Sequence, residues 1–445
     1  MTVVEERSPA HLPHLSGLHD WTARRERVLV AAAVGVAVVA GSVLAVRSGT
    51  TLKIADERQY EAIARHLADH GRYSIDGGTP TAYRPPVWPV VLAAIRLIGL
   101  NVVAARLFNV LCLAGAVVGV WRLARRVAAP GTEASSGVLA ALACAVYPTF
   151  LYAAATLYPQ SLGTALLVAM VLAALNAVDA FAGVDGDRRR GLRFAALTGL
   201  LAGLLVLTVP VFAGTAVLVV VWFAVALRRK AVPVACAFLG VALLLPVAWA
   251  IRNEVRMRAL IPVSTSDGVN LLLGNSEHAG PGTGTLTDIS GYLATVQQRG
   301  LGETAQDHYY RSAALTWIGH HPGGAAVLYL EKTAHYFSFR DQLAGSAQPS
   351  PLQSAVLAAA FLPVLALVAI RLARIRGRPL TRDEVLIIGL FLLSSLFMAV
   401  FFTRVRFRMP LDTMAIAVAA ATLAGATGRR TPGEAEAESS TLRLP

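Results

Sequence analysis

The sequence predicts an all-α polytopic membrane protein. Of its 445 residues, 55% are hydrophobic and only 15% are charged, whereas soluble domains carry about 25% charged residues. The apolar residues are gathered in runs of about 16–20, which are long enough as helices to cross the hydrocarbon core of a bilayer. Strand-type alternation of apolar and polar residues is absent from these runs, so the predicted spans are helices.

The first apolar run, 28–46, follows a polar segment that ends in Arg24, Arg25 and Arg27. No small-residue cleavage pattern follows the run, so we expect an uncleaved anchor with a cytoplasmic N-terminal tail over 1–27. About ten transmembrane helices are expected, at 28–46, 102–120, 137–156, 161–180, 194–209, 210–227, 232–250, 352–370, 383–402 and 409–426. They predict one transmembrane domain over 28–426, and a disordered cytoplasmic tail over 429–445.

The basic residues predict the orientation. The net charge is +13, but many arginines stand in short loops between apolar runs, so topology rather than nucleic-acid binding explains them. The run 86–99 would cover only about 21 Å as a helix, short of the roughly 30 Å core. If it lies along the outer face, the arginine clusters after it all become cytoplasmic, as do both termini. We therefore expect a first outer loop over 47–101 with juxtamembrane helices, and a long outer loop over 251–351 between spans seven and eight.

The acidic pair Asp56 and Glu57, in ADERQYEAIA, is the most informative motif of the chain. Carboxylates close to a membrane are costly, and they mark functional sites. Apolar residues at positions 60, 63, 64, 67 and 68 have helical spacing and predict an amphipathic surface helix that Gly71 ends. Gln59 follows Asp56 by three residues, as in a capping box. Asp56 is therefore expected to cap this helix, and a cap is compatible with a functional role.

Arginines at the predicted outer face are the second signal. Arg84 precedes Pro85 at the expected water–lipid boundary, where it either snorkels or binds an anion. Further arginines stand at outer ends of spans, against the positive-inside trend: Arg252, Arg256, Arg258, Arg404, Arg406 and Arg408. Topological noise is one explanation. The other is an anion at the outer interface, because arginine binds phosphate through several donors at once.

In this order the motifs resemble the GT-C superfamily of membrane glycosyltransferases, in particular the bacterial family 39 type, which includes protein O-mannosyltransferases, aminoarabinose transferases of lipid A and Rgt-type sugar transferases. The resemblance covers roughly 45–426 and rests on ADERQYEAIA, YRPPVWPVVLA, AARLFNVL, WAIRNEV, IPVSTSDGVNLLLGN, YYRSAALTWIGHHPGGAAVLYLEK and RVRFRMPLD. The chain departs from the pattern at Gln160, where an acidic residue is common, and at Val209, where LTVP replaces LTRP.

The resemblance implies a GT-C fold and an enzyme of the plasma membrane that transfers a hexose or pentose from a polyprenyl-phosphate donor to an acceptor hydroxyl on the extracytoplasmic face. It implies that Asp56 is the base and that Arg84, Arg404, Arg406 and Arg408 hold the donor phosphate. The residue chemistry agrees, because a carboxylate suits the acceptor proton and arginines suit the departing phosphate, which fits one displacement with inversion. The acceptor, a glycan, lipid or protein of the cell envelope, stays open.

The other candidates each have a plain and a functional interpretation. Glu57 shares the base role or binds a cation or the acceptor, and Arg252 joins the phosphate ligands. Lys332 forms an ion pair with Glu331 or is a further phosphate contact. The remaining candidates for substrate contact are Tyr60 and Trp88, otherwise part of an aromatic belt with Tyr83, and His321, which with His320 otherwise ends a solvated helix. No DxD motif or histidine cluster occurs, so no metal or other cofactor is predicted.

Two rival functions share part of these features. A transporter or flippase of lipid-linked sugars would use the same arginines without needing a base, but it predicts charged or broken helices at mid-membrane. A non-catalytic assembly protein of envelope glycan synthesis would not depend on Asp56. The enzyme is the function that the ordered motifs favour.

Overall fold

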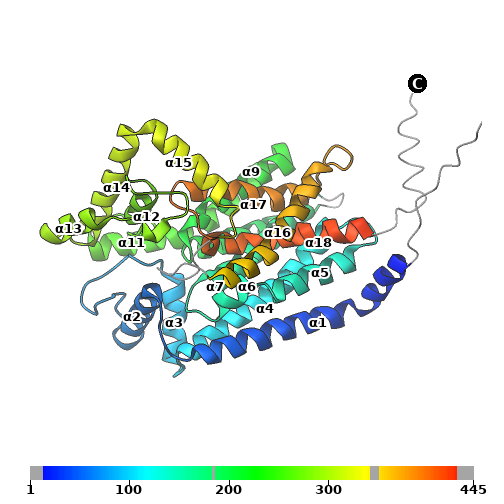
Figure 1. Ribbon diagram of the computed structural model, residues 1–445, viewed down its shortest axis with the longest axis horizontal. Coiled ribbons are helices and arrows are strands. Elements are labelled where there is room, and N and C mark those ends of the chain that lie inside the picture. The colour runs from blue at the N-terminus through cyan, green and yellow to red at the C-terminus, as the bar shows by residue number, and fades with distance from the viewer. Residues whose placement is uncertain (1–13, 183–185, 341–349, 428–445) are drawn as a thin grey trace, which may run out of the picture.

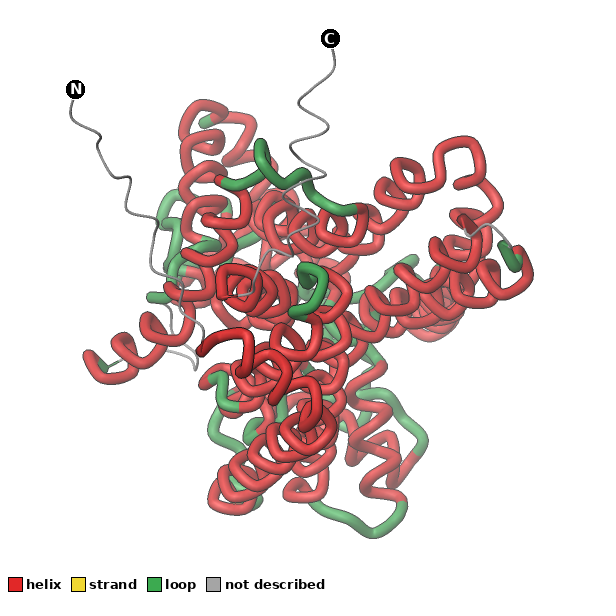
Figure 2. Tube along the Cα trace, turned by 90° about the vertical axis from the view of Figure 1, so that its right-hand side faces the viewer, coloured by secondary structure: helices red, strands yellow, loops and turns green. Residues whose placement is uncertain are grey.

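The computed structural model describes residues 14–182, 186–340 and 350–427. Figure 2 shows helices and loops throughout this part of the chain, without a strand. The predicted all-α class is therefore confirmed.

The α-helices are α1 (His14–Ser48), α2 (Ala55–His70), α3 (Val87–Leu97), α4 (Val102–Val127), α5 (Glu133–Ala145), α6 (Pro148–Ala154), α7 (Gln160–Ala182), α8 (Arg188–Val206), α9 (Ala213–Leu227), α10 (Ala231–Ala242), α11 (Leu244–Met257), α12 (Asp267–Gly274), α13 (Ser290–Gln298), α14 (Glu303–His320), α15 (Pro322–His335), α16 (Pro351–Ala373), α17 (Arg382–Ala399) and α18 (Val405–Thr427). Short 3-10 turns lie at η1 (Pro210–Phe212), η2 (Arg228–Lys230) and η3 (Gly284–Leu286).

Several helices in the described residues are long and apolar enough to cross a membrane, which makes the chain a multi-pass membrane protein. By length and composition there are six such stretches, or seven if the bent pair α5–α6 is one span. The predicted count of about ten stays a prediction. Helices α8 and α17 occupy predicted runs but begin with charged residues, and the stretch Pro210–Met257 turns at η2, after which α10 packs against α9.

The bundle has two distinct ends. Figure 1 shows α2, α3 and α11–α14 at one end, and the start of α1 and the end of α18 at the other. Three of the predicted cytoplasmic arginines pair at this second end, Arg125 with Glu26, Arg126 with Asp383 and Arg371 with Glu384. The helices of the two predicted outer loops therefore share the end opposite to these arginines, and the side of the membrane on which this end lies stays a prediction.

Some boundaries differ from the expectations. Helix α1 begins at His14, so the described part of the predicted 1–27 tail is helical, and the predicted tail over 429–445 lies outside the described residues. The short run 86–99 forms α3, which packs on α2. A cluster of Tyr60, Ala64, Trp88, Leu92, Ala93, Ala105, Leu157 and Tyr158 joins α2 and α3 to the bundle. This cluster anchors the start of α2, where the acidic pair lies.

Candidate active site

The side chain that hydrogen-bonds to the backbone at the start of α2 is that of Glu57, and not that of Asp56. The helix begins at Ala55, and the Glu57 carboxylate accepts hydrogen bonds from the backbone N–H groups of Lys53 (2.8 Å) and Ile54 (3.3 Å). A carboxylate at the third helical position reaches back to these groups, whereas Asp56 is one position too early. The expectation that Asp56 caps the helix is therefore wrong, and its carboxylate is available for other contacts.

The Glu57 carboxylate is occupied on its other side as well. It accepts a hydrogen bond from the backbone N–H of Leu157 at 2.8 Å, and the Arg106 guanidinium lies 3.6 Å away. Only 2% of Glu57 is exposed. These contacts join α2 to the segment between α6 and α7, so the geometry favours a structural role for Glu57.

Asp56 lies between two arginines that come from distant parts of the chain. One carboxylate oxygen accepts a hydrogen bond from Arg84 Nη2 at 2.6 Å, and the other accepts one from Arg406 Nη1 at 2.8 Å. We call these three residues the arginine clamp. The Asp56 side chain remains 22% exposed, so its carboxylate can be reached from the surface.

Aromatic rings support both arginines of the clamp. The Arg84 guanidinium lies 5.2 Å from the ring centre of Tyr60 and 5.1 Å from that of Tyr83, and its Nε donates to Gln59 Oε1 at 2.9 Å. Arg406 lies 4.6 Å from the ring centre of Tyr158. Such stacking stabilises the cations and restricts their rotamers.

The sequence did not predict three residues as part of the site: Gln59, Tyr158 and Glu303. Of these, only Gln59 could have been predicted, because it follows Asp56 by three residues and residues three apart share a helix face. The two departures from the family pattern, Gln160 and Val209, are both buried.

The charges of the clamp determine the ionisation of its carboxylate. Burial would raise the pKa of the Asp56 carboxyl, but Arg406 and Arg84 outweigh burial and lower this pKa to about 2. Asp56 is therefore fully ionised at neutral pH. It is also a weak base for as long as both arginines remain bound to it.

The segment before α18 places Arg404 near the clamp. Arg404 is buried, and its Nη1 donates to Thr285 Oγ1 at 3.1 Å. Lys332 fastens this segment, because its Nζ donates to the backbone carbonyls of Phe401 (2.9 Å) and Gly274 (2.9 Å) and to Asn275 Oδ1 (3.1 Å). Lys332 is fully buried, so its amine is already taken up by protein oxygens.

Arg408 and Arg252 are likewise bound to protein groups. Arg408 donates to Asp412 Oδ1 at 2.9 Å and to the carbonyls of Tyr336 and Ser338, both at 2.7 Å. Arg252 Nη1 donates to the carbonyl of Thr81 at 2.8 Å, and its Nη2 donates to that of Tyr73 at 3.2 Å. Both arginines join segments of the fold.

Trp88 and His321 lie away from the clamp contacts. Trp88 is fully buried and its Nε1 donates to the carbonyl of Leu157 at 2.9 Å, so its ring presents no face to a ligand. His321 is exposed at the junction of α14 and α15, with its ring 5.5 Å from that of Trp317. This position agrees with the solvated helix end.

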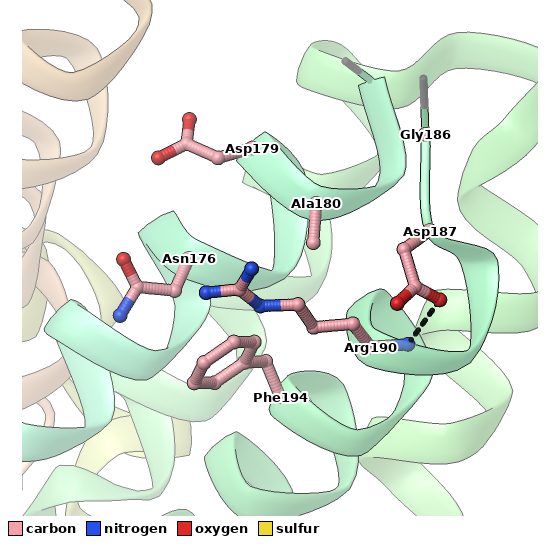
Figure 3. A pocket seen from close by; sticks show the side chains of 7 residues that line it. All are labelled: Asn176, Asp179, Ala180, Gly186, Asp187, Arg190 and Phe194. Atoms are coloured by element: carbon pink, nitrogen blue, oxygen red, sulfur yellow. Dashed lines mark hydrogen bonds between the residues drawn. The ribbon is translucent and has the colours of Figure 1, made fainter.

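A hollow of about 400 Å³ lies at the end of the bundle opposite to the clamp, between the end of α7 and the start of α8 (Figure 3). Asp179 and Tyr158 stand near opposite ends of α7, which is about 34 Å long. The Asp179 carboxylate in this hollow pairs with Arg126 and Arg382, and Asp187 accepts from the backbone N–H of Arg190. No three His, Cys, Asp or Glu side chains in the described part of the chain are grouped to hold a metal ion.

The structure is similar to those of an archaeal oligosaccharyltransferase. AglB from Archaeoglobus fulgidus, in complex with an inhibitory peptide and a dolichol-phosphate, shares 14% identity over 90% of this chain and 50% of that chain, with a TM-score of 0.55. The apo form of the Archaeoglobus fulgidus oligosaccharyltransferase shares 15% identity over 88% of this chain and 50% of that chain, also with a TM-score of 0.55. This chain spans about half the length of the archaeal enzyme.

A weaker likeness is to ArnT from Cupriavidus metallidurans bound to undecaprenyl phosphate, with 17% identity over 88% of this chain and 77% of that chain; its TM-score of 0.43 is too low to support a shared fold. No protein-family model and no curated protein matches the sequence. The two archaeal structures show that this chain shares the fold of that oligosaccharyltransferase.

Proposed function

We propose that this chain is an integral-membrane glycosyltransferase that moves a sugar from a polyprenyl-phosphate donor to an acceptor hydroxyl on the extracytoplasmic face of the plasma membrane. The observation that carries the proposal is the arginine clamp, a partly exposed carboxylate between two guanidinium groups at the loop end of a membrane bundle. The GT-C fold supports it, since AglB of the same fold is an oligosaccharyltransferase solved with a dolichol-phosphate.

In this proposal the donor phosphate competes with Asp56 for the arginines. Arg84 and Arg406, with Arg404 nearby, bind the phosphate oxygens, because guanidinium donors match phosphate as well as carboxylate. Asp56 then loses the charges that depress its pKa and becomes a better base. The clamp thereby makes the base available only when the donor is bound.

The chemical step is a single displacement at the anomeric carbon. Asp56 takes the proton of the acceptor hydroxyl, and the acceptor oxygen forms a bond to the anomeric carbon from the face opposite to the phosphate. The bond between this carbon and the phosphate oxygen breaks, and its electron pair leaves with the polyprenyl phosphate. The arginines stabilise the charge that develops there, and the sugar configuration inverts.

The assignment of the other candidates follows from their partners. The guanidinium groups of Arg408 and Arg252 and the amine of Lys332 are bound by backbone carbonyls, so we assign them to the framework around the site. The Tyr60 ring supports Arg84, because the Arg84 guanidinium lies over this ring, 5.2 Å from its centre. Glu57 positions α2, one residue from the proposed base.

The test is turnover by the purified chain in lipid nanodiscs. The chain is incubated with a panel of polyprenyl-phosphate monosaccharides and an envelope extract as acceptor, and free polyprenyl phosphate is measured. Asp56→Asn is expected to abolish its release. Asp69→Asn is the matched control, because Asp69 pairs with Arg96 on the exposed side of the same helix. Movement of the lipid-linked sugar across the bilayer without its conversion would support a flippase instead.

A further inference from the structure

The three backbone carbonyls of the segment 81–83, just before Arg84, all accept hydrogen bonds from residues of the predicted long outer loop. The carbonyl of Ala82 accepts from the backbone N–H of Thr265 at 3.1 Å, and the carbonyl of Tyr83 accepts from Ser264 Oγ at 2.8 Å. The carbonyl of Thr81 accepts from Arg252. The position of Arg84 therefore depends on residues that lie about 170–180 positions later in the sequence.

Glu303 is the centre of these contacts. One of its carboxylate oxygens accepts from Thr81 Oγ1 at 2.6 Å, and the other accepts from the backbone N–H of Ala82 at 2.8 Å and from Thr265 Oγ1 at 2.6 Å. Glu303 is the first residue of α14, so a regular helix supports its side chain. One carboxylate thus joins the Arg84 segment, the 264–266 segment and α14.

We propose that Glu303 is a positioning residue that sets the Arg84 guanidinium for the donor phosphate. This inference rests on the proposed function. Arg84 follows Ala82 by two residues, and Glu303 is the acceptor of the Ala82 N–H among the described residues. A buried N–H without an acceptor is costly, so the segment shifts to find one, and the Arg84 side chain shifts with it.

Charge-assisted hydrogen bonds to a carboxylate are the strong ones, and misplacement of a binding group by about 1 Å costs up to about 100-fold in rate. Glu303 does not contact the clamp itself in the described residues. Its effect should therefore reach the donor only through the 81–84 segment, and this distinguishes it from a further phosphate ligand.

The experiment compares Glu303→Ala and Glu303→Gln in lipid nanodiscs. Glu331→Gln is the control, because Glu331 is an exposed glutamate of α15. Amide hydrogen exchange of the peptide covering 79–87 and the affinity for undecaprenyl phosphate are measured together. Glu303→Ala is expected to speed exchange in this peptide at least tenfold and to weaken lipid binding about 5- to 20-fold. Glu303→Gln, which keeps one acceptor oxygen, should lie between Glu303→Ala and the wild type.

Thr81→Val tests whether Glu303 acts on Arg84 through the segment 81–84. If Glu303 acts through this segment, Glu303→Ala and Thr81→Val together weaken lipid binding less than the product of their separate effects. Independent effects of the two changes, or lipid affinity within twofold of wild type in Glu303→Ala, would overturn the inference. Absence of undecaprenyl phosphate binding by the wild type would instead refute the proposed function, and with it the inference.

Discussion

Asp56→Asn should abolish sugar transfer and at the same time tighten the binding of the phosphate lipid. Transfer should fall at least about 100-fold, because general-base catalysis contributes about 10²–10⁴-fold. The change in binding follows from the clamp. The ordinary pKa of the carboxyl is 3.8 and the clamp lowers it to about 2, so the ionised carboxylate gains about 2 kcal/mol from its surroundings at about 1.4 kcal/mol per pH unit.

When the donor phosphate binds Arg84 and Arg406, it must replace the attraction between these arginines and the Asp56 carboxylate. An asparagine keeps the shape but not the charge, so the variant is expected to bind undecaprenyl phosphate up to about 30-fold more tightly than the wild type. Binding is measured by titration in nanodiscs, and transfer is measured by release of polyprenyl phosphate. Asp69→Asn should change neither. Weaker lipid binding in Asp56→Asn, or transfer at the wild-type rate, would refute the reasoning.

Two further predictions separate framework residues from catalytic ones, and a third concerns the pH dependence of stability. Glu57→Gln should lower the free energy of unfolding in detergent by about 1–3 kcal/mol, because one acceptor of its buried network is lost; full stability with lost transfer would instead make Glu57 catalytic, and Glu61→Gln is the control. Lys332→Met should destabilise the chain by about 2–4 kcal/mol, because it leaves buried carbonyls without a donor, while Lys53→Met should not. A stable Lys332→Met variant that binds undecaprenyl phosphate weakly would restore the predicted phosphate contact. Burial and the neighbouring Asp307 raise the pKa of Asp267 to about 6. The folded chain therefore becomes less stable as pH rises from about 4 to 6, because the Asp267 carboxyl must ionise in a buried place. Asp267→Asn should be about 1–3 kcal/mol more stable than wild type at pH 7.5 but equal to it at pH 4. Equal thermal unfolding of the two proteins at both pH values would contradict this.

The sequence by itself determined the helical membrane character, the C-terminal end of α2 and the place of the acidic pair near the start of this helix. These are local or periodic properties: apolar runs report span length, and Gly71 ends α2 with a φ of +66°. The arginines that the sequence predicts at the outer face could also be identified, because the positive-inside rule uses only position along the chain.

Only the tertiary structure decided which charges meet. Asp56 and Arg406 are 350 positions apart, and no local pattern relates them. The predicted arginines Arg252 and Arg408 look like Arg84 and Arg406 in sequence, yet backbone carbonyls take up their donors. The two acidic residues likewise differ only by one helical position, which turns Glu57 toward the backbone and leaves Asp56 for the arginines. Partner choice is a property of packing, and packing brings together side chains that sequence distance keeps apart.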